Sequence, residues 1–451
     1  MRRIAAALLV LVALGAHAAE RAHVYLVVVD GLDVRLATPA AMPRLFAAVA
    51  DDPAHATRFA EVRAVMPART NPNHVTLVTG VWAETHGITG NAWWSRRPDA
   101  RAAKTDDARL VQVETLFTSA GAATPPRVTI GVFAKPKLGR LFEAVPGRQR
   151  APTVLWAPDR ARDVPRDPAT GYSDDATTMN ALVAALAARE PDLAVVNLSD
   201  VDRTAHAHGP DSAECRAAVA AADAAVARLL DALRAAGRWE RSVVIVTADH
   251  GFASVAPTPE RPAPSVVLRA ALENAPEADV RALRTVADGG VAHVYDRRAT
   301  ARTLGGAERT LARAAERLRT ASGVAQVLAR LPVPDVPLLA EAHPDWHLAR
   351  SERMGDLLVV AAPGFQFVDE AGGVDARLRG NHGGPGELGV PLVVLGGSAR
   401  LRPAPPGAVA RAVDVAPTIA ALLGIPLGGR VGGGPIDARD RGRVLDVMRA
   451  E

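Results

Sequence analysis

The sequence predicts an α/β protein built on a largely parallel β-sheet, and three observations lead to that class. Short runs of Val, Ile and Leu recur along the chain, as in strands that are buried on both faces. Helical patterns separate several of these runs, which is the order of elements that builds a parallel sheet. Polar side chains directly follow the runs, at the sheet edge where functional groups gather in α/β proteins.

The predicted elements can be placed in chain order. Strands are predicted for six apolar runs, at residues 23–29, 128–133, 193–198, 242–247, 357–361 and 390–395. Residues 42–50 and 215–236 have helical patterns and lie between these runs. The alternation of the two kinds of pattern therefore favours a sheet covered by helices.

The first 18 residues have the features of a secretory signal. Two arginines are followed by an apolar run over residues 4–14 and by Ala-His-Ala at 16–18, which is typical of a cleavage site. The apolar run is shorter than the roughly 20 residues of a spanning helix. We therefore expect a periplasmic or secreted protein without a membrane span after signal removal. The alternative is an uncleaved N-terminal anchor.

Charge and cysteine content exclude two classes of feature. The formal net charge is +4, and no basic run is interleaved with aromatic residues, so no nucleic-acid polymer is expected as a partner. Cys215 is the single cysteine, which excludes an intramolecular disulfide. It lies in the helical pattern over 215–236, and a buried, inert thiol is expected there.

The stretch from residue 66 to residue 80 places a hydroxyl at a turn with a helix behind it. Pro67 and Pro72 bracket Thr70, which predicts stiff, extended backbone there and a helix over residues 73–79. Thr70 is then expected at the N-terminal mouth of this helix, where free N–H groups and the helix dipole favour an oxyanion. A hydroxyl in such a place needs only a metal or a base to act as a nucleophile.

Four separate segments deliver carboxylate and imidazole groups to one rim of the predicted sheet. The residues are Asp30, Asp202, His206, Asp249, His250 and His382. Mixed Asp and His ligands suit zinc, and three protein ligands leave a position for water or substrate. Two such ions about 4 Å apart could hold the attacking and leaving oxygens of an in-line displacement. The number and order of these residues indicate a two-metal hydrolytic site.

Five motifs in a fixed order carry a family resemblance. They are Val28-Val-Asp30-Gly, Thr70-x-Pro-Asn-His-x-x-Leu-Val-Thr-Gly, Asp202-x-x-x-His206-x-x-Gly-Pro, Thr247-Ala-Asp-His-Gly251 and Gly380-Asn-His-Gly383. With them the chain resembles the alkaline phosphatase superfamily and, within it, the nucleotide pyrophosphatase/phosphodiesterase branch. The resemblance runs from about residue 24 to residue 424. It implies an alkaline-phosphatase-like α/β sandwich and a metal-dependent hydrolase of phosphoric esters.

The resemblance also implies a role for each motif residue. Asp202, His206 and His382 would hold one zinc ion, while Asp30, Asp249 and His250 would hold the other. Manganese or iron could take the place of zinc. Thr70 would bridge toward the second ion and act as the nucleophile, forming a phosphothreonine that water hydrolyses. The Asn91 side-chain amide would donate to a phosphoryl oxygen.

Neighbouring histidines are given other roles. His208 lies two residues past His206 and is the alternative ligand, but the spacing of His206 matches the family motif. His74 and His86 flank the nucleophile stretch and are expected to bond to backbone there.

The motifs leave more than one class of phosphorus-containing substrate open. Thr70-Asn-Pro-Asn and Ala134-Lys-Pro-Lys-Leu138 resemble phosphonoacetate hydrolases, in which Lys135 and Lys137 would be the substrate-binding pair. Asn71 and Asn197 take places where nucleotide-cleaving members tend to carry Phe and Tyr that stack on the base. We therefore expect a small phosphorylated or phosphonate substrate, with a phosphodiester favoured over a phosphonate or a phosphomonoester. A non-catalytic metal or phosphate binder is disfavoured, because the nucleophile and all ligands are present.

A long segment between Asp249-His250 and His382 is predicted to be an insertion. Residues 19–252 and 380–451 would form the catalytic core, and residues 253–379 a cap subdomain. The insertion has a helical pattern near residues 307–321 and Pro-rich segments at 257–264 and 331–337. Such insertions commonly cover a site and select its substrate.

Overall fold

The computed structural model describes residues 21–97, 100–146, 151–273, 277–300, 302–369, 371–373 and 375–449. The predicted signal at residues 1–18 lies outside this range, as does the adjoining cleavage position. Within the described residues, no helix combines the length and the apolar character needed to cross a membrane.

A seven-stranded sheet in the order β2-β18-β9-β1-β8-β6-β7 forms the centre of the larger lobe. Its strands are β1 (His23–Val29), β2 (Ala56–Arg58), β6 (Thr129–Phe133), β7 (Val154–Trp156), β8 (Leu193–Leu198), β9 (Ser242–Thr247) and β18 (Leu392–Leu395). β1 pairs in parallel with β8 and β9, and β6 pairs in parallel with β7 and β8. Only β18 runs antiparallel to its neighbours. The predicted α/β class with a largely parallel sheet is confirmed.

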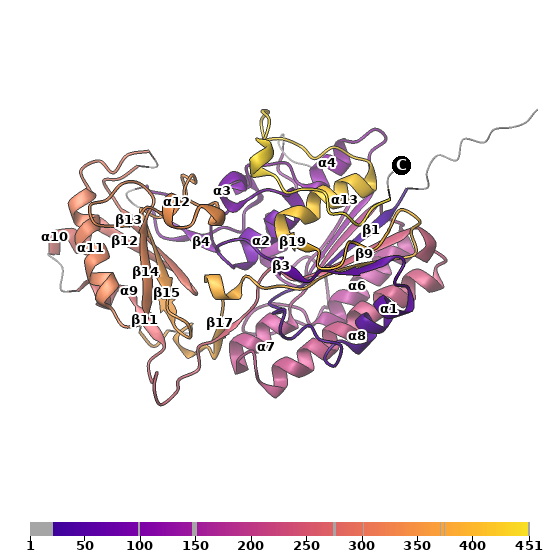
Figure 1. Ribbon diagram of the computed structural model, residues 1–451, viewed down its shortest axis with the longest axis horizontal. Coiled ribbons are helices and arrows are strands. Elements are labelled where there is room, and N and C mark those ends of the chain that lie inside the picture. Colours follow the sequence, from indigo (N-terminus) through magenta and orange to yellow (C-terminus); the bar gives the residue numbers. More distant parts are fainter. Residues whose placement is uncertain are drawn as a thin grey trace, which may run out of the picture.

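Helices cover both faces of this sheet (Figure 1). One face carries α1 (Pro43–Asp51), α6 (Asp175–Ala188) and α8 (Ala213–Ala235). The other carries α2 (Thr70–Thr79), α4 (Leu116–Ala122) and α13 (Val415–Leu423). The central strands β1, β8 and β9 are mostly apolar, in keeping with their burial on both faces. Cys215 is buried on α8, as predicted, and burial raises its pKa to about 11.

Helix α2 begins earlier than the sequence predicted. It starts at Thr70 instead of residue 73, so that Pro72 falls inside its first turn. A proline is tolerated there because the N–H groups of the first turn have no intrahelical partner to lose. The last core strand starts at Leu392 instead of residue 390, since Pro391 has no N–H to give to the ladder.

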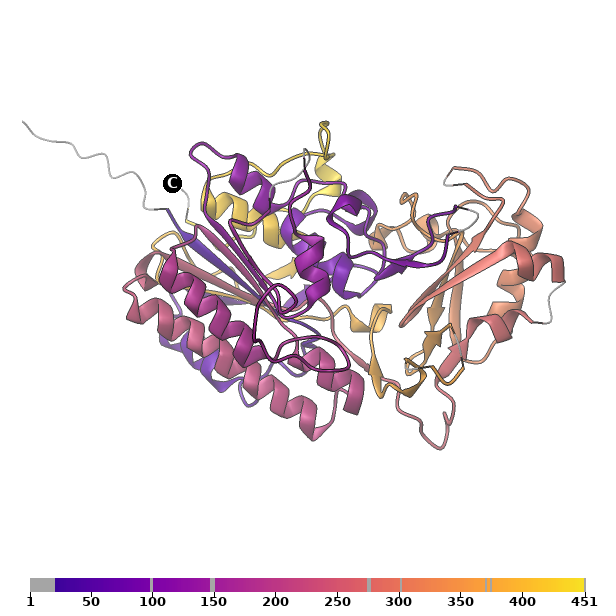
Figure 2. The same ribbon diagram turned by 180° about the vertical axis from the view of Figure 1, so that it is seen from behind.

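The segment between the two core parts contains a second, four-stranded antiparallel sheet, seen at the left of Figure 1. Its order is β12 (Leu283–Asp288), β13 (Val291–Asp296), β15 (Leu357–Ala361) and β14 (Val324–Ala329). β15 was predicted as a strand from its apolar run, but it belongs to this sheet. Helices α9 (Leu268–Leu272), α10 (Glu277–Ala282) and α11 (Glu308–Thr320) accompany it. We call residues 265–368 the outer lobe; Figure 2 shows it from behind.

Short elements join the two lobes and complete the core. They are α3 (Ala83–His86), α5 (Pro136–Leu141), α7 (Asp200–His208), α12 (Leu339–Ala342), β3 (Glu61–Arg63), β4 (Ala92–Trp93), β5 (Ala103–Lys104), β10 (Ala253–Ser254), β11 (Ser265–Val267), β16 (Gln366–Val368), β17 (Gly380–Asn381) and β19 (Val409–Arg411). The Arg96 guanidinium forms a bidentate pair with Asp356 of the outer lobe at 2.9 and 3.0 Å. Trp94 packs edge-on against Tyr295. These contacts fix the outer lobe against the loop that follows α3.

Candidate active site

The carboxyl ends of three adjacent parallel strands meet the start of α2. Asp30 follows β1, Asp202 lies on α7 after β8, and Asp249 and His250 follow β9. Strand β17 follows the outer lobe in the chain, and His382, directly after this strand, lies at the same place. The segments that the sequence predicted to share one rim therefore do so.

One group of ligand atoms surrounds an oxygen of Asp202. The Nε2 atoms of His206, His382 and His250 lie 3.5, 3.6 and 4.0 Å from Asp202 Oδ1. This oxygen is buried and makes no hydrogen bond. An anionic oxygen without a partner, facing three imidazole nitrogens, is a geometry that a cation would complete.

A second group surrounds Nε2 of His250. Asp249 Oδ2, Thr70 Oγ1 and Asp30 Oδ1 lie 3.3, 3.4 and 3.5 Å from this nitrogen. Asp249 Oδ2 is also buried without a hydrogen bond, although His74 Nδ1 lies 3.3 Å away. The predicted nucleophile is thus in contact with one of the two candidate ligand groups.

The tightest sets of three ligands are Asp202, His250 and His382, and Asp30, Asp249 and His250. The second set has the composition that the family resemblance implied. In the first set His250 takes the place that was implied for His206. His206 lies outside this set and is partly exposed, while His208 is exposed.

Each histidine is oriented by backbone. The Nδ1 atoms of His206, His250 and His382 lie 2.9, 3.0 and 2.7 Å from the carbonyl oxygens of Gly380, Gly251 and Ala68. An Nδ1–H donated to a carbonyl leaves Nε2 free as a ligand. Burial lowers the pKa of all three rings, that of His250 to about 4, so the neutral form needed for ligation prevails at pH 7.

The carboxylates are held as firmly. Asp249 Oδ1 accepts from the N–H groups of Gly31 and His250. Asp30 Oδ2 accepts from Asn197 Nδ2 at 2.9 Å. Burial and the neighbouring Asp249 raise the pKa of Asp30 to about 7. Three carboxylates in one buried space repel each other, and a bound cation would relieve that repulsion.

Lys135 is placed differently from a lysine that only binds substrate. Its ammonium lies 2.7 Å from both Asp30 Oδ1 and Asp202 Oδ2, and the side chain is 1% exposed. Burial opposes its charge, but Asp202 and Asp30 outweigh this and raise its pKa. Lys135 therefore links one carboxylate of each ligand group.

Thr70 is the first residue of α2 and is buried. His74 Nδ1 lies 3.0 Å from the Thr70 carbonyl oxygen, one turn along the helix. His86 accepts from the N–H of Ile88, so both flanking histidines bond to backbone as predicted. The Thr70 hydroxyl stands at the positive end of the helix, where an anion is stabilised.

Asn91 is oriented for donation toward the cavity. Its Oδ1 accepts from the N–H of Asn71 at 2.9 Å, and its own N–H is bonded to Asp288. The Nδ2 group has no protein acceptor within the described residues, and Asn91 lines the cavity that contains Thr70. Its amide can thus supply the donor that the family resemblance implied.

The cavity over Thr70 has a volume of about 430 Å³. Lys137 and Tyr172 line it, together with Lys104 and Arg203 at the same wall. Lys137 makes no hydrogen bond or ion pair within the described part of the chain. Burial and nearby Lys135 lower its pKa to about 7. Asn71 lines this cavity, but Asn197 lies beneath it, fully buried between Asp30 and His74.

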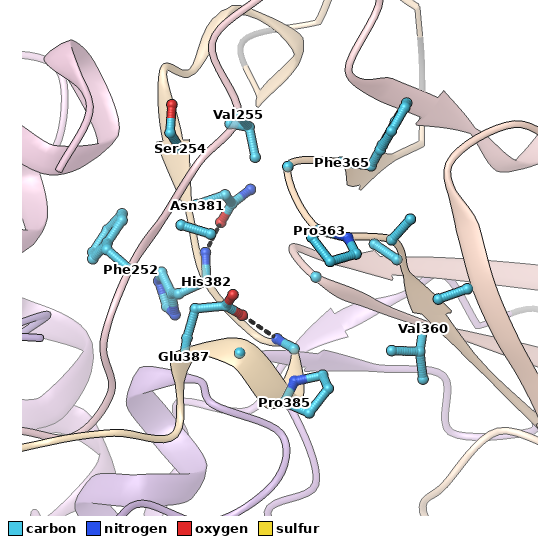
Figure 3. A pocket seen from close by; sticks show the side chains of 18 of the residues that line it. Phe252, Ser254, Val255, Val360, Pro363, Phe365, Asn381, His382, Pro385 and Glu387 are labelled. Atoms are coloured by element: carbon cyan, nitrogen blue, oxygen red, sulfur yellow. Dashed lines mark hydrogen bonds between the residues drawn. The ribbon is translucent and has the colours of Figure 1, made fainter. Parts of the chain in front are cut away.

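A second cavity of about 700 Å³ shares Asn381 and His382 with the first (Figure 3). Its wall is largely apolar, with Phe252, Val255, Val360, Pro363 and Phe365. Glu387 lines it and accepts from the N–H of Gly384 at 2.7 Å. The segment that carries His382 is therefore bordered by two cavities.

The sequence did not point to two residues of the site, Asp288, which bonds to Asn91, and Tyr172, which lines the cavity. Asn197 was named from the sequence as the counterpart of a base-stacking residue, but it bonds to Asp30 and His74 beneath the cavity. Asp288 lies 197 positions from Asn91 and carries no local pattern.

Known proteins resemble this chain in sequence and in structure. A curated relative, the venom phosphodiesterase of Naja atra, is 24% identical over 218 residues, which cover 43% of this chain. The match covers 22% of the relative, so the chain matches about a fifth of that protein's length.

Two solved structures share the fold. Murine ectonucleotide pyrophosphatase/phosphodiesterase 5, in an inactive form in complex with AMP, superposes with a TM-score of 0.67 at 18% identity, over 90% of this chain and 96% of that chain. Phosphonoacetate hydrolase from Sinorhizobium meliloti in complex with phosphonoformate superposes with a TM-score of 0.65 at 22% identity, over 90% and 96% of the two chains. At these identities they establish the fold.

A family match extends over most of the chain. Residues 24–385 match the family described as type I phosphodiesterase / nucleotide pyrophosphatase. This range begins in β1 and ends just after His382, so it includes both ligand groups and Thr70. The chain therefore belongs to the type I phosphodiesterase / nucleotide pyrophosphatase family of the alkaline phosphatase superfamily, as its motifs predicted.

Proposed function

We propose that this protein is an exported, two-zinc phosphodiesterase that uses Thr70 as its nucleophile. The observation that carries the proposal is the position of the Thr70 hydroxyl, 3.4 Å from His250 Nε2 at the N-terminus of α2. Two buried carboxylate oxygens without partners, on Asp202 and Asp249, support metal binding at the same place. Export rests on the signal pattern in residues 1–18.

The two ligand groups suit zinc in their chemistry. Asp30, Asp249 and His250 would hold one ion, and Asp202 and His382 the other, with His206 or His250 as its third ligand. Bound zinc would supply Lewis acidity, which lowers the pKa of a nearby hydroxyl and offsets charge on a phosphoryl group. Manganese or iron could fill the same sites.

The residues of the chain supply the other parts of the reaction. The Thr70 oxygen would attack phosphorus, forming a phosphothreonine as the bond to the leaving oxygen breaks, and water would hydrolyse that ester. The Asn91 amide and the N–H groups at the start of α2 would donate to the phosphoryl oxygens as negative charge develops. Removal of one such donor commonly costs about 10²–10³-fold in kcat.

A phosphodiester is favoured by the family, which is described as type I phosphodiesterase / nucleotide pyrophosphatase. The murine structural neighbour is in complex with AMP, which makes a nucleotide a candidate part of the substrate. Tyr172 at the cavity wall offers an aromatic face beside Lys135, whose ammonium lies 5.3 Å from the ring centroid. A base or another planar leaving group could pack against such a face.

The test compares hydrolysis of bis-p-nitrophenyl phosphate and p-nitrophenyl phosphate by the zinc-loaded protein. We expect a clear preference for the diester, and a fall in kcat of at least about 10³-fold in Thr70→Ala. Thr70→Ser is the matched control, since it keeps a hydroxyl at the same position and should retain measurable turnover. If Thr70→Ala cleaves the diester as fast as the wild type does, the proposal is contradicted.

A second candidate function is hydrolysis of a carbon–phosphorus bond. Lys137 favours it, because its ammonium lines the cavity without a protein partner and could receive a carboxylate. The fold of phosphonoacetate hydrolase is also shared. If this function is correct, the protein releases phosphate from phosphonoacetate, and Lys137→Met raises KM for it about tenfold or more. Lys104→Met, at the same cavity, serves as the control. Absence of phosphate release by a zinc-loaded protein that cleaves the diester would exclude this candidate.

A further inference from the structure

The turn between β12 and β13 of the outer lobe enters the candidate active site. Gly290 N–H donates to the His382 carbonyl oxygen at 3.0 Å. Gly289 has a φ of +68°, and a Cβ there would overlap the same carbonyl oxygen. A Cβ on Gly290 would lie 2.6 Å from Gly384 N. The turn thus packs backbone to backbone against the segment that carries His382.

Asp288, the last residue of β12, reaches two residues of the core. Its Oδ2 accepts from the N–H of Asn91 at 2.9 Å, and its Oδ1 lies 2.9 Å from Nε of Arg69. The carboxylate is 3% exposed. It fits because residue 90 is glycine, where a Cβ would lie 2.5 Å from Asp288 Oδ2. A buried charge with two such partners makes a specific contact instead of an incidental one.

The hydrogen bond from Asn91 to Asp288 acts on the residue proposed to donate to the phosphoryl group. Asn91 is held by its N–H on Asp288 and by its Oδ1 on the Asn71 N–H. With both groups engaged, its Nδ2 is the donor that remains, and Asn91 lines the cavity. Without Asp288, the Asn91 backbone would lose this hydrogen bond, and the Asn91 side-chain amide would no longer be held in one orientation.

The ion pair between Asp288 and Arg69 lies next to the proposed nucleophile. Arg69 directly precedes Thr70 and donates from Nη1 to the His382 carbonyl at 2.9 Å and to Asn381 Oδ1 at 3.2 Å. Asp288 holds the Nε side of the same guanidinium. The arginine is therefore fixed between the outer lobe, α2 and the His382 segment.

We propose that Asp288 is a positioning residue: through Asn91 and Arg69, the outer lobe completes the phosphoryl-binding face of the core. The inference rests on the proposed function, because it assigns Asn91 to the phosphoryl group. It explains why a segment about 200 positions away in the chain contributes a buried carboxylate to this site.

A double-mutant cycle between Asp288 and Asn91 tests it. Asp288→Ala is expected to lower kcat about 10–100-fold at unchanged zinc content, and Asn91→Ala about 10²–10³-fold. In the Asn91→Ala background, Asp288→Ala should cost less than about threefold, since the Asn91 amide is gone and only the contact with Arg69 is left to lose. If the fall in kcat of the double variant equals the product of the two single-variant falls, the inference is overturned.

Two further variants separate positioning from folding. Asp279→Ala removes another carboxylate of the outer lobe, which pairs with Arg313 and Thr310 away from the cavity, and should keep wild-type kcat. Asp288→Asn keeps an oxygen for the Asn91 N–H but loses the charge opposite Arg69, and should show an intermediate kcat. If Asp279→Ala lowers kcat as much as Asp288→Ala at equal melting temperature, the effect is a general one of the lobe and the inference fails.

Binding of inorganic phosphate to zinc-loaded Thr70→Ala, measured by calorimetry, makes the result independent of turnover. Asp288→Ala and Asn91→Ala should each weaken phosphate binding, and the double variant should weaken it by clearly less than the product of the two single effects. If this coupling appears in a protein that cleaves no phosphoester, the proposed function fails while the positioning stands. If the diester is cleaved and the coupling is absent, only the positioning inference fails.

Discussion

Single side chains in the candidate site are oriented mainly by the backbone around them. Three imidazoles direct Nδ1 to carbonyl oxygens, and Asp249 accepts two backbone N–H groups. Such contacts fix ring and carboxylate directions independently of any ligand. The donors are therefore preorganised, while one oxygen each of Asp202 and Asp249 is left without a hydrogen-bond partner among the described residues.

The identity of these donors was readable from the sequence, because their motif spacings are short and ordered. Their grouping was not. Whether His250 or His206 lies nearer to His382 depends on how the segments after β8 and β9 approach each other. The ring centroids of His250 and His206 lie 3.4 and 5.2 Å from that of His382, and a difference of this size has no sequence signal. Asp288 could not be predicted for a related reason, since its partner Asn91 lies 197 positions away in the chain.

His250 should control both metal sites. It is common to the two tightest ligand sets, so His250→Ala leaves each with only two ligands. We expect the zinc content after dialysis to fall from about two ions per chain to below one, while His206→Ala keeps at least about one. Elemental analysis of the dialysed protein measures this.

His208→Ala is the control for that measurement, because the exposed ring contacts neither group and both ions should be retained. Equal zinc loss in His250→Ala and His206→Ala would favour the ligand sets implied by the family resemblance over the tightest sets of this structure.

At the scale of elements, two helices of the core stabilise each other's first turns. Asp175 Oδ1 accepts from the N–H groups of Ser199 and Asp200 at the start of α7, and Asp200 Oδ2 accepts from the Asp175 N–H at the start of α6. These N–H groups would otherwise lack partners. Since α7 carries Asp202 and His206, this reciprocal contact also sets the position of one ligand group.

The charge on Asp175 makes this contact pH-dependent. Burial and the nearby Asp200 raise its pKa to about 8, and its Oδ2 has no hydrogen-bond partner. Between about pH 4 and pH 8 the folded state holds a proton that the unfolded state releases, so the free energy of unfolding falls as pH rises through this window. Asp175→Asn keeps the Oδ1 acceptor and removes that dependence.

We therefore expect Asp175→Asn to gain stability relative to the wild type as pH rises, by about 1–3 kcal/mol between about pH 5 and pH 7.5. Urea unfolding at the two pH values, with a chelator present, measures the difference. The matched variant Asp174→Asn, which alters a neighbouring cap at the same helix start, serves as the control. A constant difference between Asp175→Asn and the wild type would mean that Asp175 is ionised at both pH values.

At the scale of the whole molecule, the sequence predicted more of the core than of the outer lobe, where it indicated one strand and the helix near residues 307–321 that the structure shows as α11. Core strands such as β1 and β9 are buried on both faces and read as continuous apolar runs. Strands β12 and β14 are only partly buried, so their composition does not stand out. Of the outer sheet, only β15 was predicted, because its run is apolar throughout. The place of this lobe against the site depends on tertiary contacts such as Arg96–Asp356.

The Gly289-Gly290 turn has a consequence for exchange of lobes between related enzymes. Its backbone touches the His382 and Gly384 segment so closely that no side chain fits at either position. A graft that brings in the outer lobe of a relative would therefore succeed only with glycine at both positions, however different the rest of the lobe is. These two glycines therefore restrict which outer lobes can pack against this core.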